Sequence, residues 1–168
     1  MKQAHMKDLI WVASQARVVL DTVLEKFQPQ FKTKRETTGG YFILADGLSG
    51  LPEFSMFLGQ LPDERAAEVV HYAAEKARRL AVTSLEESHH LSWQSRDPDL
   101  NRWGGAVFFH DADKILSFSG FPELWDEAAM LALGVRLFDA SSMDIFGLAR
   151  ISDNPHIGVL ARGLGLPF

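Results

Sequence analysis

The side chains best suited to chemistry in this chain are histidines, and two of them are adjacent in a polar segment. A neutral imidazole binds zinc, copper or haem iron when a neighbouring group orients it, so His89 and His90 are the candidate metal ligands. Adjacent side chains of an extended segment point to opposite faces, so only one of the two suits a given site. An exposed polar loop is the commoner interpretation of such a pair.

Carboxylates form a second group of candidates. Glu68 and Glu75 flank His71 at helical spacing, where they either orient its imidazole or share a solvated helix face with it. Asp126 and Glu127 are paired carboxylates near the start of another predicted helix. An enzyme of unrecognised type would use His71 or Asp126. Otherwise the two acids are favourable charges at a helix N-terminus.

A third group combines aromatic and glycine positions that can surround a small ligand. Trp93 and Trp103 lie near predicted loops and can line a flat apolar pocket. Gly104 and Gly105 allow close backbone approach or a positive φ, so we expect them to tolerate valine far less well than Gly134. The predicted ligand-binding residues are His89, His90, Trp93, Trp103, Gly104, Gly105, Ser119, Gly120 and Asp126. Free backbone donors after Ser119 and Gly120 suit an anion such as a carboxylate or a haem propionate.

The composition excludes several chemistries. The 168 residues contain no cysteine, which excludes a disulfide scaffold, a cysteine nucleophile, an iron–sulfur cluster and thiolate-bound zinc. The phosphate-loop, GxSxG and HExxH motifs do not occur. The net charge of −5 disfavours nucleic acid as a partner. These absences favour a binding protein over an enzyme.

Neither a secretory signal nor a membrane-spanning segment is predicted. A span needs about 18–20 consecutive apolar residues, and no segment of the sequence has them. Asp8, Gln15, Arg17 and Asp21 interrupt the N-terminal region. Together with the absence of cysteine, this predicts a cytoplasmic protein without a membrane partner.

Local patterns predict the elements that must position these residues. Apolar residues at three- and four-residue steps predict helices over residues 4–27 and 62–80. Compact β-rich runs predict strands over residues 41–45, 51–58, 103–110 and 114–118. The last two strands form a hairpin, and residues 84–102 are expected to be a loop. This order of elements favours an α+β fold, an antiparallel sheet flanked by three main helices.

A third helix is predicted over residues 122–138, and it is apolar on nearly every side. Such a helix is buried, either in the core or in a subunit contact. We expect a single domain over residues 1–139 and an apolar C-terminal extension over residues 140–168, packed on the domain or on a partner subunit. Because monomers rarely expose large apolar patches, a dimer or larger homo-oligomer is predicted.

Residues 62–138 carry four short motifs in a characteristic order. An alanine-rich helix contains Ala74-Glu75-Lys76-Ala77, Gly104-Gly105 opens a strand, Ser119-Gly120 ends the next strand, and Asp126 opens an alanine-rich final helix. In this order and spacing the stretch resembles the GlcG/HbpS-like haem-binding family. That family is also found as the C-terminal module of some corrinoid adenosyltransferases.

The resemblance implies a profilin-like layout, assembly into dimers or rings, and haem or a related tetrapyrrole as ligand and cofactor. With no cysteine in the chain, histidine is the expected ligand of haem iron. We rank His89 and His90 above His71, because the acids beside His71 would repel haem propionates. The chain is thus expected to bind a small ligand. The alternative is a non-enzymatic accessory, sensor or assembly domain with an unknown ligand.

Overall fold

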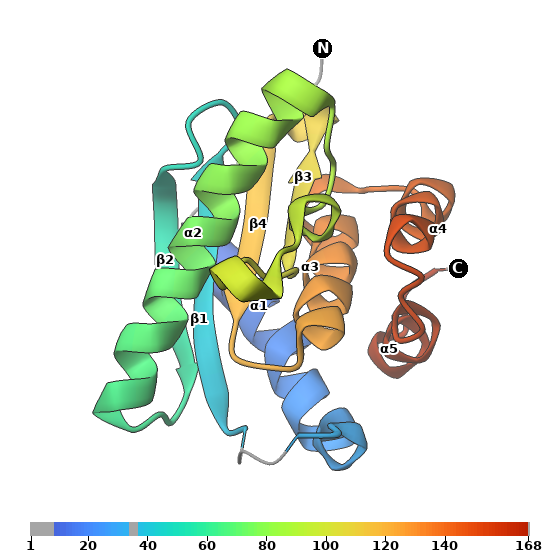
Figure 1. Cartoon of the computed structure of the whole chain (residues 1–168). Coiled ribbons are helices and arrows are strands. Elements are labelled where there is room, and N and C mark those ends of the chain that lie inside the picture. Colours follow the sequence, from blue (N-terminus) through green and yellow to red (C-terminus); the bar gives the residue numbers. More distant parts are fainter. Residues whose placement is uncertain (1–8, 34–36, 168) are drawn as a thin grey trace.

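The computed structural model describes residues 9–33 and 37–167 of the chain. Within them, a four-stranded antiparallel sheet in the order β2-β1-β4-β3 forms the centre (Figure 1). The strands are β1 (Gly39–Asp46), β2 (Pro52–Gly59), β3 (Ala106–Phe109) and β4 (Lys114–Ser119). The predicted α+β class and its antiparallel sheet are confirmed. The predicted strand over residues 103–110 is shorter in the structure, since residues 103–105 lie outside the ladder.

Helices cover both faces of the sheet (Figure 1). α2 (Asp63–Glu87) packs on the face toward which Ile43 and Ala45 of β1 point. α1 (Leu9–Thr22) and α3 (Glu123–Phe138) pack on the other face, with Phe42 and Leu44. Strand residues alternate between faces, so β1 contributes to two separate cores. Shorter helical turns are a π-helix at Val23–Phe27 and 3₁₀ turns at Gln28–Gln30, Ser92–Ser95, Pro98–Leu100 and His110–Ala112.

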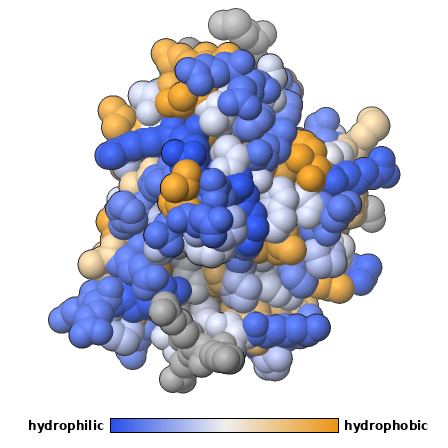
Figure 2. All heavy atoms as spheres, viewed as in Figure 1, coloured by the Kyte–Doolittle hydropathy of each residue, from blue (hydrophilic) through white to orange (hydrophobic). Residues whose placement is uncertain are grey.

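α2 is the long helix on the front of Figure 1, and its sequence explains both its ends and its packing. Asp63 and Glu64 lie in the first turn, where the helix dipole favours acids. Ala73 and Ala77 are fully buried and allow the helix to approach the sheet closely. The helix ends at Ser88, whose φ of 56° is left-handed, so it extends beyond the predicted end at residue 80. Figure 2 shows that this side of the molecule is mainly hydrophilic, with separate hydrophobic patches.

α3 lies between the sheet and the C-terminal helices, and this position accounts for its apolar character. α1, β3 and β4 contact it on one side, and α4 (Ser142–Ile151) and α5 (Ile157–Leu164) contact it on the other. Ile145, Ile157 and Leu160 join the same core as α3. The described part of the tail therefore packs on its own chain. The apolarity of α3 and of the tail no longer argues for a subunit contact.

Two glycines show how closely the layers approach each other. A Cβ at Gly105, whose φ is +117°, would lie 2.7 Å from Cβ of Asp126. A Cβ at Gly134 would lie 2.0 Å from Cζ of Phe109, because α3 packs directly on β3 at that point. The expectation that Gly134 tolerates valine much better than Gly105 is therefore wrong. The error arose because a glycine inside a helix gives no sequence signal of what packs against it.

Candidate functional site

Four of the nine predicted ligand-binding residues line one of two cavities, which lie at opposite ends of α3. The first, here called the polar cleft, has a volume of about 560 Å³ and lies between α2, the segment 101–103 and the start of α3. Trp103, Ser119 and Asp126 line it. The second, here called the aromatic groove, has a volume of about 490 Å³ and lies between the β3–β4 turn, the end of α3 and α4. His90 lines this groove.

A buried ion pair forms the floor of the polar cleft. Lys76 of α2 donates to Oδ2 of Asp126 at 3.1 Å and to the carbonyl oxygen of Phe118 at 2.9 Å. The backbone N–H of Phe121 donates to Oδ1 of Asp126 at 2.8 Å. Both charged side chains are only about 2% exposed, so burial raises the pKa of Asp126 to about 7 although Lys76 and Phe121 oppose the rise. Gly105 packs against this pair, and a side chain there would displace it.

The charged groups at the mouth of the cleft are paired as well. Arg65 and Glu68 form an ion pair at 2.6 Å on α2. Glu123 bonds Arg96 at 2.7 Å and accepts the N–H of Gly104 at 3.0 Å. The ionised groups of the cleft thus neutralise one another, and they hold α2, α3 and the intervening loop together. This arrangement suits a structural role better than capture of a charged ligand.

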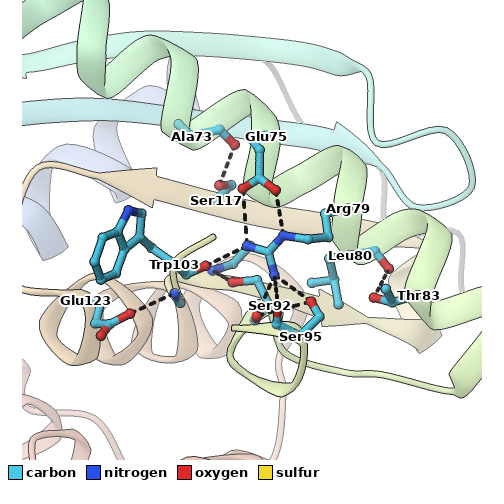
Figure 3. A network of polar contacts seen from close by, with 12 residues as sticks. Ala73, Glu75, Arg79, Leu80, Thr83, Ser92, Ser95, Trp103, Ser117 and Glu123 are labelled. Carbon is cyan, nitrogen blue, oxygen red and sulfur yellow. Dashed lines mark hydrogen bonds and ion pairs between the residues drawn. The ribbon is translucent and has the colours of Figure 1, made fainter. Parts of the chain in front are cut away.

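The segment before β3 is held by Arg79 of α2. Its guanidinium bonds Glu75 on its own helix and donates to the carbonyl oxygens of Ser92 and Trp103 at 2.8 Å and 2.7 Å (Figure 3). Ser95 accepts a further bond. The expected loop over residues 84–102 therefore begins as the last turn of α2, and one half-buried cation then satisfies carbonyl groups of the segment that follows.

Arg96 places the two predicted tryptophans beside the cleft. Its guanidinium lies 5.0 Å from the ring centroid of Trp93 and 5.6 Å from that of Trp103. Trp93 also packs on Gly104, where a Cβ would lie 2.8 Å from the indole ring. Gly120, the remaining predicted glycine, packs against the backbone of Gly39 and Gly40.

The aromatic groove has three phenylalanine walls and a histidine pair. Phe109 and Phe138 lie with ring centroids 5.3 Å apart, and Phe108 lies 4.0 Å from the ring of His110. His90 meets His110 edge to face, with ring centroids 4.7 Å apart. Burial first, and then the neighbouring imidazoles of His110 and His89, lower the pKa of His90. The lowered pKa favours the neutral imidazole of His90, the form that binds metals.

The backbone of His90 is held on both sides, which gives its ring a defined position. Its N–H donates to Oε1 of Gln94 at 2.7 Å, and its carbonyl oxygen accepts the N–H of Phe108 at 2.9 Å. His89 lies outside the groove lining, and its Nε2 contacts Glu87 at 3.3 Å. The two adjacent histidines thus occupy different surroundings. Among the described residues, no group of three histidine or acidic side chains is arranged to hold a metal ion.

Sequence reasoning missed several residues of both cavities. Lys76 occurs within the buried stripe of α2, three residues after Ala73 and four before Leu80. A lysine at such a position signals a buried partner. Phe138 gave no comparable signal, because it joins the groove only when β3, the following turn and the end of α3 come together.

The comparisons add no relative. No family model, curated protein or solved structure matches the chain. The resemblance to the GlcG/HbpS-like family therefore rests on the four short motifs alone. No helix in the described part of the chain has the length and apolar character required to cross a bilayer.

Proposed function

We propose that the protein binds a flat, apolar small molecule in the aromatic groove. The observation that carries the proposal is the imidazole of His90 beside the phenylalanine walls of a cavity of about 490 Å³. Ligand sites commonly have volumes of roughly 300–1,000 Å³, apolar walls and a few polar groups. The polar cleft is a weaker candidate because its charged groups are paired with one another.

The groove suits an aromatic ligand because its walls present ring faces and edges. Offset and edge-to-face contacts add about 0.5–1.5 kcal/mol per ring pair beyond the area buried. Phe138 is partly exposed, so a ligand can reach its ring without opening the core. His90 and His110 supply polar atoms at the side of the groove, where they can orient a bound ring system.

Haem, which the family resemblance implies, fits this groove only in part. His90 has the neutral form that binds haem iron. However, Asp111, Asp139 and Asp144 line the groove, and no lysine or arginine of the described residues does. These carboxylates would repel the two propionates of haem, so the lining does not fit haem well. Haem binding and the cytoplasmic location stay predictions.

The test uses the fluorescence of N-phenyl-1-naphthylamine, an uncharged aromatic probe, together with a hemin titration followed by absorbance. Phe138→Ala and His90→Ala should weaken probe binding several-fold, since each removes part of the groove wall. His71→Ala is the matched control, because His71 is an exposed histidine of α2 remote from the groove. Absence of probe binding, or equal loss in all three variants, would refute the proposed site. A hemin Soret shift that His90→Ala abolishes would establish haem as the ligand.

A further inference from the structure

The charges around the aromatic groove all have one sign. Asp111 follows β3, Asp139 ends α3, and Asp144 lies in the first turn of α4. All three are exposed residues that line the groove, and no lysine or arginine of the described chain lines it. Arg150, also on α4, is exposed but outside the lining.

These carboxylates are available to a ligand. None of the three forms an ion pair with another described residue. Asp144 accepts a hydrogen bond from the hydroxyl of Ser141 at 2.6 Å, which leaves its charge uncompensated. The negative end of α3 and the positive end of α4 meet beside the groove, so their dipole contributions oppose each other. The side-chain carboxylates therefore decide the sign of the local potential.

We infer that the groove selects a planar aromatic cation over an aromatic anion of similar size. This inference rests on the proposed function, because it gives the charge of the ligand that the same groove binds. Each exposed carboxylate contributes a factor of about two to five to the binding of a nearby cation. Together they favour a cation over an anion by roughly tenfold or more at low salt, and the preference weakens as salt screens it.

Three aromatic probes separate charge from shape. Proflavine is a planar cation, N-phenyl-1-naphthylamine is neutral, and 1-anilinonaphthalene-8-sulfonate adds one negative charge to the neutral skeleton. We expect affinity to fall in that order. The double variant Asp139→Asn with Asp144→Asn should weaken proflavine binding about fivefold and leave the neutral probe unchanged. Asparagine suits both positions, since it tolerates the left-handed backbone of residue 139 and still accepts the Ser141 hydrogen bond.

The control is Asp63→Asn, which removes an exposed carboxylate from the start of α2, away from the groove lining. Anionic binding as tight as cationic binding would overturn the charge preference and leave the proposed function standing. An equal loss of proflavine affinity in the control would overturn it as well. If none of the three probes binds, the proposed function itself fails.

A second, independent observation concerns the two edges of the sheet. The outer edge of β3 is covered, since Leu91 forms a bridge with Val107 and the carbonyl of His90 accepts the N–H of Phe108. β2 is the other edge, and no described strand pairs with its outer side. It is eight residues long, which is long for an unprotected edge.

β2 also lacks the side chains that usually protect an edge. Its one charged residue, Glu53, is engaged by Lys114 at 3.1 Å. Phe57 is 50% exposed, and its ring centroid lies 4.7 Å from that of Tyr41. Natural edge strands commonly carry lysine or an inward charge to prevent pairing. The outer backbone groups of β2, with which no described strand pairs, thus lie beside an apolar ring.

We propose that a second copy of the chain pairs with this edge through its own β2, forming a continuous eight-stranded antiparallel sheet. A two-fold axis at Met56 places Phe54 opposite Leu58 of the other copy, and Ser55 opposite Phe57. Phe54, Met56 and Leu58 belong to one sheet face, so like residues meet across the interface. The same register separates the two Glu53 side chains, the only like charges of β2. An isologous contact of this kind closes as a dimer.

Light scattering at micromolar concentration tests this pairing. We expect a dimer that Phe57→Lys converts to a monomer and that Leu85→Lys leaves intact. Leu85 is a matched control, as an exposed apolar residue of α2 (68% exposed). Circular dichroism verifies that both variants fold, and amide exchange of β2 should slow as protein concentration rises. A native monomer, a dimer insensitive to Phe57→Lys, or fast β2 exchange in the dimer would overturn the proposal.

Discussion

Replacement of Glu127 by glutamine should remove a large part of the pH dependence of folding. Glu127 is a fully buried residue of α3, covered by the segment between α4 and α5. Its Oε1 accepts hydrogen bonds from Ser152 and from Asn154, the latter at 3.0 Å. Its Oε2 is buried and has no hydrogen-bond partner among the described residues. Ionisation would therefore place negative charge on a buried carboxyl that is hydrogen-bonded through one oxygen only.

The magnitude follows from the pKa of this carboxyl. Burial raises it from 4.5 to about 7, and the Ser152 and Asn154 bonds only partly oppose the rise. At about 1.4 kcal/mol per pKa unit, this shift corresponds to about 3 kcal/mol. Because the pKa is higher in the folded chain, this stability is fully present below pH 4.5 and is lost as the pH rises to about 7. A loss of this size is a large share of the roughly 5–15 kcal/mol that typical domains have.

Urea denaturation of the native chain and of Glu127→Gln between pH 4.5 and pH 8.5 tests this reasoning. Glutamine resembles the protonated carboxyl, so the two proteins should be equally stable at pH 4.5. Above pH 7 the variant should be more stable by about 3 kcal/mol. Asp126 and its ion pair with Lys76 are the same in both proteins, so the difference between them isolates Glu127.

Glu86→Gln serves as the control, since Glu86 is an exposed acid near the end of α2. It should leave the pH profile unchanged. If the unfolding free energy of Glu127→Gln follows that of the native chain from pH 4.5 to pH 8.5, the buried carboxyl does not lose its proton in this range, and the raised pKa of Glu127 is refuted.

Three further predictions concern the contacts that hold the cavities together, and urea denaturation measures each. Lys76→Met should cost about 3–5 kcal/mol, because it leaves Asp126 buried without its ion partner; a neutral result would show that the pair is dispensable. Gly105→Ala should cost about 1–3 kcal/mol, since its φ is +117°, whereas Gly158→Ala, with open space around its Cβ, should be neutral or stabilising. Equal effects would contradict the steric reasoning. Arg79→Lys should cost about 2 kcal/mol and speed amide exchange over residues 92–103, because lysine cannot reproduce the guanidinium bonds; unchanged exchange would show that the segment is ordered by other contacts.

Much of the architecture could be predicted from local sequence. The apolar stripe of α2, the acids in its first turn and the β3–β4 hairpin depend on residues within a few positions of each other, which is the range of helical and turn interactions. The antiparallel α+β class followed from the order of these elements. Helix ends were less accurate, since α2 continues to Glu87 by burying Leu80 and Ala81 against the sheet.

The cavities could not be predicted in the same way. Lys76 and Asp126 are fifty positions apart, and their pairing depends on how α2 and α3 cross opposite faces of one sheet. His90 meets His110 because the segment before β3 folds along its edge. The four predicted ligand residues that line a cavity therefore divide between two cavities, and the other five line neither.

Residue types and local spacing determined which elements form and which faces they bury, because those choices depend on neighbouring residues. Only the tertiary structure decided which charges neutralise one another and which stay available to a ligand. Asp126 was predicted as a site residue, yet in the fold it is compensated by Lys76. Asp139 and Asp144 drew no attention in the sequence, yet they line a groove to which the described residues contribute no lysine or arginine. Whether a carboxylate is compensated depends on burial and on charge pairing between residues far apart in the sequence, and no local pattern encodes these.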